Sequence, residues 1–568
     1  MQPLLQCLRV SHAMGTRTLF RDIDLTINTG DRIGLVGHNG SGKSTLLSIL
    51  TGKEEPDQGD IARNRDLHLS VVEQFIDPAL NPMTLLDALT DRLPLEDQLA
   101  RRHEAEALLV SLGFEEREFD HQVEDLSGGQ QNRLMFARAT ILMPNLILFD
   151  EPTNHLDLKT LVIFENCLRS MKAAFLVISH DREFLDSVTD QTVFLRDERL
   201  YHFSLPYSAA RQALDEQDAA ALAAREQEEK QIRRLEASAH RLAQWGKVYD
   251  NEKIARKAKN MEKRIERMRD EQTFVSRGSG LKLELDVGSA QANRMLHIEQ
   301  CDITAPDGTR LFHIEDMMIR PGDRVALLGH NGAGKTTLIN RIMNQYKTNP
   351  EGDGIRFNPR CDIGYYDQEL QRLDPALGLT ETLREQCGGP DSALTAALIK
   401  AGFPYQDLDK KVAVLSGGER ARLMFLIMRM NQPNFLILDE PTNHIDIQGK
   451  EELEDQILES NATVIITSHD RRFVENIAQR YLLIAGGQLT EINDPADFYR
   501  SSIASQRTTT QSSASTGPST LDTEEEVLAR IVELEELLEA DLARKPKFQK
   551  PGLQAAWREE LDQLNRRL

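Results

Sequence analysis

The sequence predicts an α/β fold in which one unit of strands and helices occurs twice along 568 residues. Residues 146–157 have the sequence Leu-Ile-Leu-Phe-Asp-Glu-Pro-Thr-Asn-His-Leu-Asp, and residues 436–446 have almost the same sequence. A glycine-rich loop at residues 37–45 returns in the same way at residues 329–337. An apolar run that ends in paired acids is typical of a buried parallel strand. Because matching positions keep a separation of about 290 residues, we infer a duplicated domain.

Length, composition and charge narrow the class of protein. The chain is several times longer than one hydrophobic core requires, so we expect several domains. It has 40% hydrophobic and 28% charged residues, no long apolar run and no export signal, so we expect a cytoplasmic protein without membrane spans. Its five cysteines lack any Cys-x-x-Cys pair, which argues against a zinc or iron–sulfur site. The net charge of −22 disfavours non-specific nucleic-acid binding, so any such contact must be local.

Each glycine-rich loop has the Gly-x-x-x-x-Gly-Lys-Ser/Thr pattern of a phosphate-binding loop, between an apolar strand candidate and a helical pattern. In this pattern backbone N–H groups wrap the phosphates, and Lys43 or Lys335 adds a positive charge. The hydroxyl of Ser44 or Thr336 is a ligand for Mg²⁺. The two loops are Gly37, His38, Asn39, Gly40, Ser41, Gly42, Lys43, Ser44 and Thr45, and Gly329, His330, Asn331, Gly332, Ala333, Gly334, Lys335, Thr336 and Thr337.

The paired acids lie where an open α/β sheet binds its ligands, at the carboxyl ends of strands. Asp150 and Asp439 therefore suit Mg²⁺, and Glu151 and Glu440 suit activation of water as general bases. A Leu-Ser-Gly-Gly motif precedes each pair, at residues 126–129 and 415–418, and opens a helix. Since each phosphate loop already holds the phosphates of its own domain, this second group of donors makes most sense facing a nucleotide on the opposite domain.

Phosphate loop, glutamine, Leu-Ser-Gly-Gly, acid pair and histidine, in this order and twice over, resemble ATP-binding cassette (ABC) ATPases. The Glu-Pro-Thr-Asn-His motif and a charged linker between two cassettes resemble those of the F subfamily, whose members act on ribosomes. The resemblance covers about residues 1–500. It implies two P-loop ABC-type domains that pair head to tail within a monomer, hydrolyse ATP with Mg²⁺, and bind ribosomal RNA and P-site transfer RNA.

The resemblance also assigns residues to the two ATP sites. It implies that His180 and His469 face the γ-phosphate as catalytic residues, and that the loops of Asp157 and Asp446 cross between the cassettes. The residues that it implies at Mg²⁺ and the attacking water are Gln74 and Gln368. The residues that it implies as completing the opposite site are Ser127 and Gly129 for the second phosphate loop, and Ser416 and Gly418 for the first. His12 or Phe20 is a candidate for stacking on adenine at the first site.

The segment between the cassettes is a charged helical stretch from about residue 210 to residue 274. Apolar residues spaced by threes and fours predict two antiparallel helices with a tip near residues 245–247. Residues 247–269 hold nine Lys or Arg against four Asp or Glu, a net of +5. A solvated helix face would have this composition too. In the F subfamily the equivalent linker reaches RNA. The resemblance therefore implies RNA contacts by Lys247, Lys253, Arg256, Lys257 and Lys259.

Beyond residue 500 we expect a Ser/Thr-rich tether at residues 501–520 and a second helical hairpin (a coiled coil) at residues 521–568. The expected domains are a first cassette at residues 1–205, a linker at residues 206–290 and a second cassette at residues 291–500. Two other functions stay open at this point. A DNA-directed ABC ATPase in repair or transposition control would act through the C-terminal hairpin. A transporter energy subunit is disfavoured by the tandem form and the long linker.

Overall fold

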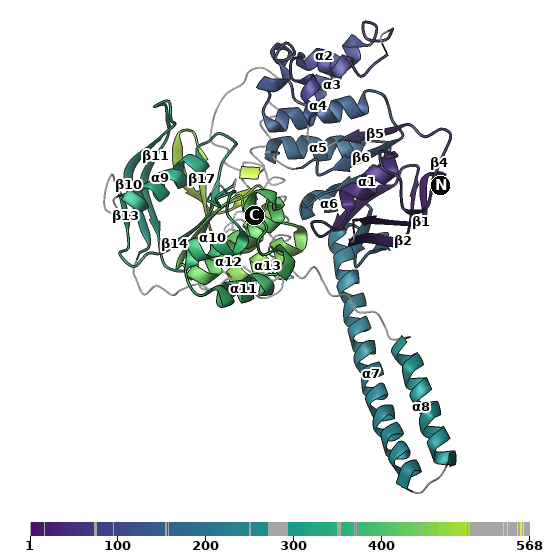
Figure 1. The fold of residues 1–568 in the computed structure, drawn as a ribbon. Coiled ribbons are helices and arrows are strands. Elements are labelled where there is room, and N and C mark those ends of the chain that lie inside the picture. Colours follow the sequence, from purple (N-terminus) through teal and green to yellow (C-terminus); the bar gives the residue numbers. More distant parts are fainter. Residues whose placement is uncertain are drawn as a thin grey trace.

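The computed structural model describes residues 2–15, 17–72, 76–94, 96–153, 156, 158–248, 252–270, 294–348, 354–368, 370, 372–443, 445–460, 462–496 and 498–499, and the separate positions 538, 542, 554, 557, 558 and 561. Two cassettes face each other, and a pair of long helices projects away from them (Figure 1). The predicted tether and C-terminal hairpin lie outside the described residues, apart from those six positions.

The first cassette contains a six-stranded sheet in the order β5–β6–β7–β3–β8–β9, parallel except for the β8–β9 pair. Its central strands are short apolar runs, and β7 is buried at every position because helices cover both faces of a parallel sheet. The strands of this sheet are β3 (Arg32–Gly37), β5 (Leu69–Val72), β6 (Leu146–Asp150), β7 (Ala174–Ile178), β8 (Gln191–Arg196) and β9 (Arg199–Phe203). A separate antiparallel sheet holds β1 (Pro3–Met14), β2 (Arg17–Asn28) and β4 (Gln58–Arg63).

The helices of the first cassette fall into two groups. Those that follow the strands of the parallel sheet are α1 (Lys43–Thr51), α5 (Leu158–Ser170) and α6 (Arg182–Val188). Those of a helical layer at one end are α2 (Leu85–Thr90), α3 (Arg102–Ser111) and α4 (Gly128–Thr140). Helix α4 begins directly after Ser127, so the Leu-Ser-Gly-Gly motif opens a helix as predicted.

The second cassette repeats this plan, but its strands join into one nine-stranded sheet in the order β13–β10–β11–β18–β17–β12–β16–β15–β14. A single parallel bridge between His313 and Gln488 connects the antiparallel and parallel parts. The strands are β10 (Leu296–Thr304), β11 (Arg310–Ile319), β12 (Arg324–Leu328), β13 (Ile355–Phe357), β14 (Ile363–Tyr366), β15 (Phe435–Asp439), β16 (Thr463–Thr467), β17 (Arg480–Ala485) and β18 (Gln488–Ile492). The helices are α9 (Lys335–Thr348), α10 (Leu379–Cys387), α11 (Asp391–Lys400), α12 (Gly417–Asn431), α13 (Ile447–Glu459) and α14 (Arg471–Ile477).

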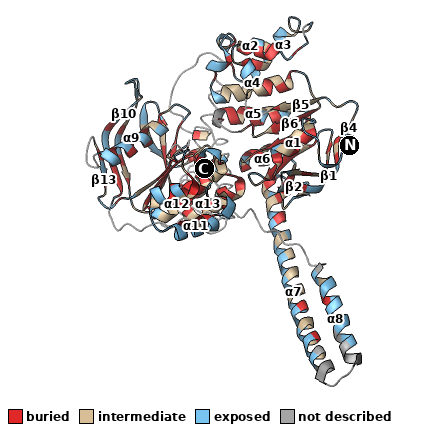
Figure 2. Ribbon diagram, viewed as in Figure 1, coloured by how far each residue is buried: buried red, intermediate tan, exposed pale blue. Residues whose placement is uncertain are grey.

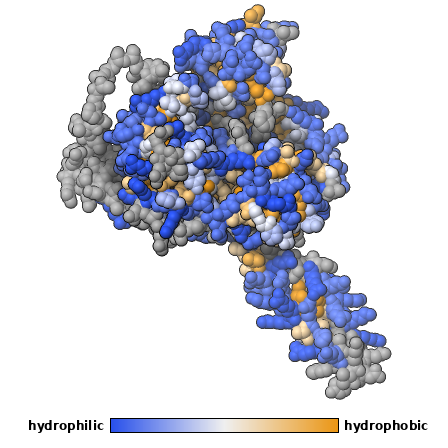
Figure 3. Space-filling view, turned by 60° about the vertical axis from the view of Figure 1, so that its left-hand side comes forward, coloured by the Kyte–Doolittle hydropathy of each residue, from blue (hydrophilic) through white to orange (hydrophobic). Residues whose placement is uncertain are grey.

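The linker consists of α7 (Tyr207–Val248) and α8 (Glu252–Asp270), which pack side by side. Buried Ile232, Ala239 and Ile265 form their shared seam, as the predicted apolar stripes require. Figure 3 shows a largely hydrophilic surface on this arm, with hydrophobic atoms along the seam. Residues 245–247, which were predicted at the tip of the hairpin, belong to α7, so this helix continues further than the sequence pattern indicated.

Buried residues gather inside the two cassettes, whereas the linker helices are mostly exposed or half-buried (Figure 2). One core of the first cassette includes Ile447 from α13 of the second, so the two cassettes share an apolar contact. Among the described helices, none has the length and apolar character needed to cross a membrane. The cassettes are therefore the folded bodies that position the predicted site residues.

Candidate functional site

Both glycine-rich loops hold a lysine side chain at their centre. The Lys43 ammonium donates to the carbonyl oxygens of Gly37 (2.8 Å) and His38 (3.1 Å). In the second cassette Lys335 makes the equivalent bonds, at 2.8 and 3.2 Å, to Gly329 and His330. Burial lowers the pKa of Lys43, and the nearby carboxylates of Glu151, Asp446 and Asp150 oppose this shift. Each ammonium is thus fixed inside its loop, where it can meet an anion.

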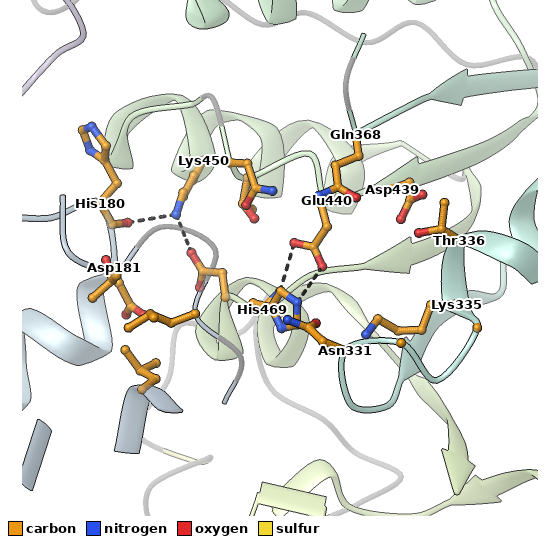
Figure 4. A pocket seen from close by; sticks show the side chains of 18 of the residues that line it. His180, Asp181, Asn331, Lys335, Thr336, Gln368, Asp439, Glu440, Lys450 and His469 are labelled. Carbon is orange, nitrogen blue, oxygen red and sulfur yellow. Dashed lines mark hydrogen bonds and ion pairs between the residues drawn. The ribbon is translucent and has the colours of Figure 1, made fainter. Parts of the chain in front are cut away.

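A cavity of about 380 Å³ lies beside the second phosphate loop, between the cassettes (Figure 4). Its wall in the second cassette includes the predicted residues Asn331, Gly332, Gly334, Lys335, Thr336, Thr337, Gln368, Asp439, Glu440 and His469. Its wall in the first cassette includes Thr153, Leu156, His180 and Asp181. The structure therefore gathers most of the predicted second ATP site around one cavity, and closes that cavity with residues of the other cassette.

Three side chains that line this cavity could together hold a divalent cation. Asp439 is 1% exposed, and its Oδ1 accepts a hydrogen bond of 2.5 Å from the Thr467 hydroxyl. Its Oδ2 is buried and has no hydrogen-bond partner among the described residues. Burial and the charge of Glu440 raise the pKa of Asp439. Because Thr336 and Gln368 line the same cavity and supply only oxygen ligands with Asp439, this group suits Mg²⁺.

The two candidate general bases share an unusual backbone conformation. Glu151 and Glu440 both have φ of 49°, in the left-handed region that non-glycine residues seldom adopt. Such strain persists where the surroundings enforce it, which is often at functional sites. Glu440 receives backbone support from Thr467, whose carbonyl and hydroxyl oxygens accept from the Glu440 N–H at 3.0 and 3.1 Å.

Each candidate base lies beside the predicted histidine of its own cassette. Glu151 Oε1 is 3.1 Å from His180 Nε2, and Glu440 Oε1 is 3.5 Å from His469 Nε2. The His469 backbone N–H also donates to Glu440 Oε2 at 3.2 Å. Burial lowers the pKa of His180, and the nearby Glu151 carboxylate opposes that shift. The predicted base and histidine therefore occur together twice.

The loop that was expected to cross between the cassettes does so in the second cassette. Asp446 is 3% exposed, and its Oδ2 accepts a hydrogen bond of 3.0 Å from the Asn39 N–H of the first phosphate loop. Its Oδ1 accepts from the Gly449 N–H at the start of α13. The equivalent Asp157 lies outside the described residues, as does Gln74 of the first site.

The Leu-Ser-Gly-Gly motifs do not reach a phosphate loop of the opposite cassette at the described cavity. Ser127 and Ser416 are exposed, and neither residue lines the cavity beside the second loop. Each serine N–H instead donates within its own helix cap, to Gln130 Oε1 at 2.9 Å and to Glu419 Oε2 at 2.8 Å. Gly129 and Gly418 belong to the same two helix starts. A composite site would need these helices to approach the opposite loops.

Of the two adenine-stacking candidates at the first site, the structure contradicts Phe20, whereas His12 stays a prediction. Phe20 is fully buried, and its ring lies under the first phosphate loop, against Gly42. His12 is 9% exposed and lies 3.2 Å from Glu54 Oε1. Phe20 therefore faces the core, whereas the ring nitrogens of His12 face the exposed carboxylates of Glu54 and Asp57.

Sequence reasoning missed several buried charged residues that join the cassettes. Arg182 pairs with Glu454 of the opposite cassette, and Lys450 donates to the backbone carbonyl oxygen of His180. The available signal was that Lys450 and Glu454 lie on the buried face of α13, and that the first cassette has Leu161 in the place of Lys450. A single copy of the repeat could not reveal these contacts, because the two partners of each contact belong to different cassettes and lie hundreds of residues apart.

Comparisons with known proteins agree with the twofold repeat. The family model described as ABC transporter matches residues 20–154 and 313–443. ABC transporter F family member 5 of Arabidopsis thaliana is 30% identical over 532 residues, which cover 85% of this chain and 75% of that protein. The ribosome protection protein VmlR of Bacillus subtilis is 30% identical over 516 residues, 87% of this chain and 89% of that one.

Solved structures share the fold at lower sequence identity. The archaeal ribosome recycling factor aABCE1, solved with the ribosomal stalk protein aP1, superposes with a TM-score of 0.58 at 17% identity. The match covers 93% of this chain and 98% of that one, so the tandem arrangement as a whole is common to both folds.

Proposed function

The chain belongs to the F family of ATP-binding cassette proteins and is an ATPase, and from this premise we propose that it acts on the ribosome in translation. The similar protein VmlR is named for ribosome protection, which supports a ribosomal target. In this proposal the protein is a cytoplasmic monomer whose own two cassettes pair. ATP brings the cassettes together and positions the linker, and hydrolysis releases the protein.

The observation that carries this proposal is the contact between the linker and both cassettes. Helix α7 starts at Tyr207, which is 2% exposed and belongs to a core of the first cassette. One residue on, the Ser208 hydroxyl accepts a hydrogen bond of 2.8 Å from Arg472 of the second cassette. Arg211 lies 3.6 Å from Glu451 on α13. Any change in how the cassettes meet must therefore alter the base of the linker.

In this proposal the two ATP sites supply the groups that phosphoryl transfer to water requires. We assign charge neutralisation to Lys43 and Lys335, and orientation and deprotonation of the attacking water to Glu151 and Glu440. Bound Mg²⁺ would neutralise further phosphate charge, held by Asp439, Thr336 and Gln368 at the second site. The corresponding metal residues at the first site are Asp150, Ser44 and Gln74.

The basic part of the linker is the proposed RNA-binding surface. Arg256, Lys257 and Lys259 are exposed on α8, and cations bind nucleic acid by releasing counterions from phosphates. The side chains of Lys247 and Lys253 lie outside the described residues. Because the whole chain carries −22, these local cations mark where a polyanion can approach.

Co-sedimentation tests the proposal. The variant Glu151→Gln/Glu440→Gln should remain ATP-bound, and we expect it to sediment with purified ribosomes when ATP is present. The control Lys43→Ala/Lys335→Ala, which lacks the phosphate-loop charges, should remain in the supernatant. Duplex and single-stranded DNA are assayed in the same salt. ATP-dependent binding to DNA without binding to ribosomes would instead support a DNA-directed ATPase and overturn the ribosomal role.

A further inference from the structure

One buried lysine touches the histidine loops of both cassettes. Lys450 lies on α13 and is 5% exposed. Its ammonium donates at 2.9 Å to the backbone carbonyl oxygen of His180, in the first cassette. It also donates at 2.9 Å to Asp470 Oδ2, in its own cassette. Figure 4 shows this side chain between the two loops, at the end of the cavity away from Lys335.

Both contacts lead directly to a candidate active-site group. His180 lies 3.1 Å from Glu151, the candidate base of the first site. Asp470 follows His469, whose N–H donates to Glu440 at the second site. Asp470 also caps α14 through the Phe473 N–H at 2.9 Å, so its position determines where the loop meets the helix. A shift in either histidine loop therefore changes a hydrogen bond made by the same ammonium.

The first cassette has no counterpart to this lysine. Leu161 occupies the equivalent place, four residues after Asp157 as Lys450 is four after Asp446, and it is 5% exposed. A leucine cannot donate a hydrogen bond. Burial and the charge of Asp470 raise the pKa of Asp181, the equivalent of Asp470, to about 6. Burial would also raise the pKa of Asp470, but the charges of Lys450 and Arg182 outweigh burial and lower that pKa to about 2.

We propose that Lys450 is a positioning residue that couples the two ATP sites, because it holds the histidine loop of one site against that of the other. The inference rests on the proposed roles of His180 and His469 at those sites. It implies that the histidine loop of the second site stays in place as long as that site holds ATP that it has not hydrolysed. Through Lys450, the fixed loop of the second site then restrains the histidine loop of the first site. Turnover at the first site would then be slowed by the state of the second.

ATP turnover of the free, full-length protein tests this coupling. Four proteins are compared: the parent, Glu440→Gln, Lys450→Met, and Glu440→Gln with Lys450→Met. We expect Glu440→Gln to lower turnover by more than the twofold that loss of one independent site would give. Adding Lys450→Met should raise that residual turnover at least about threefold, since the first site is freed from the stalled second site.

Matched variants separate coupling from a structural role. Lys450→Arg, which keeps a cationic donor, should leave the residual turnover of Glu440→Gln low. Leu161→Met, at the equivalent place in the first cassette, should leave unchanged the ratio of turnover between the parent and the Glu440→Gln background. If Lys450→Met fails to fold, Lys450→Gln is measured in its place. An equal fold-change in turnover from Lys450→Met in both backgrounds would overturn the inference. Because no ribosome is present, failure of the ribosomal role would not affect this result.

Discussion

Arg182 of the first cassette and Glu454 of the second form an ion pair in which each side chain is only 3% exposed. Asn476 completes the pair by donating to Glu454 Oε2 at 2.9 Å. In the repeat, Arg471 of the second cassette corresponds to Arg182, and Glu165 of the first cassette corresponds to Glu454. These two side chains form the equivalent ion pair, at 3.9 Å. Since each arginine follows a His-Asp pair, the interface has approximate twofold symmetry, with one tight and one loose ion pair.

The tight pair should matter more for stability than the loose one. Arg182→Met would leave the Glu454 carboxylate buried without its cation, which costs about 3–5 kcal/mol in comparable sites. Arg471→Met should lower the free energy of unfolding by clearly less, because Glu165 Oε1 lies 3.9 Å from the Arg471 guanidinium. Thermal unfolding of both variants measures the difference. An equal decrease in thermal stability would mean that the closer approach of the first pair adds nothing.

Glu165 should make the stability of the protein depend on pH. Burial raises the pKa of this carboxyl to about 7, although Arg471 opposes the shift. A folded-state pKa above the unfolded value stabilises the protein at low pH, and that stabilisation is lost as pH rises through about 7. Glu165→Gln removes this effect. Its melting temperature relative to the parent should therefore rise between pH 5 and pH 8, whereas exposed Glu226→Gln should show no such trend.

Replacement of both candidate bases should separate ATP binding from hydrolysis. Glu151→Gln/Glu440→Gln keeps the size of each side chain but removes the basic carboxylate. We expect nucleotide affinity to persist and steady-state turnover to fall by about 10² to 10⁴, the usual contribution of a positioned base. Turnover near that of the parent would rule out these residues as the bases.

A variant of the Leu-Ser-Gly-Gly motif tests whether the ATP sites are composite. In a Lys335→Ala background only the first site should turn over. Adding Ser416→Arg, in the opposite cassette, should lower that remaining turnover by at least about 10²-fold, as loss of aligned backbone and side-chain donors does elsewhere. Ser127→Arg in the same background is the control, because it would affect the site already silenced. Persistent activity with Ser416→Arg would refute the cross-cassette arrangement.

Charge reversal on the linker tests the RNA-binding surface. Changing Lys253, Arg256, Lys257 and Lys259 to Glu should weaken ribosome binding of the hydrolysis-deficient protein. Each cation that no longer neutralises a phosphate should lower the slope of log affinity against log salt by up to about one. The matched control reverses four exposed cations on α7 outside the basic stretch: Lys230, Arg233, Arg234 and Arg241. Equal binding by both variants across a salt series would make this part of the linker only a spacer.

Local patterns predicted the fold and most of the second-cassette residues that line the cavity beside the second phosphate loop, because each motif is short and its geometry follows from its own residues. The phosphate loops, the acid after each strand and the histidine loops are of this kind. The buried contacts of Arg182 and Lys450 could not be predicted in this way, since they depend on how two repeats meet. Phe20 was misjudged because an aromatic residue near a loop packs beneath it as readily as it faces a ligand.

The length of α7 sets how far small movements of the cassettes are carried. It is one continuous helix of 42 residues, which at 1.5 Å per residue makes an arm about 60 Å long. Its base touches both cassettes, through Tyr207, Ser208 and Arg211. A tilt of about 5° at that base would swing the far end of such an arm by about 5 Å. On such an arm, a displacement of about half an ångström at Arg211, about 6 Å along the axis from Tyr207, would correspond to about 5 Å at Val248.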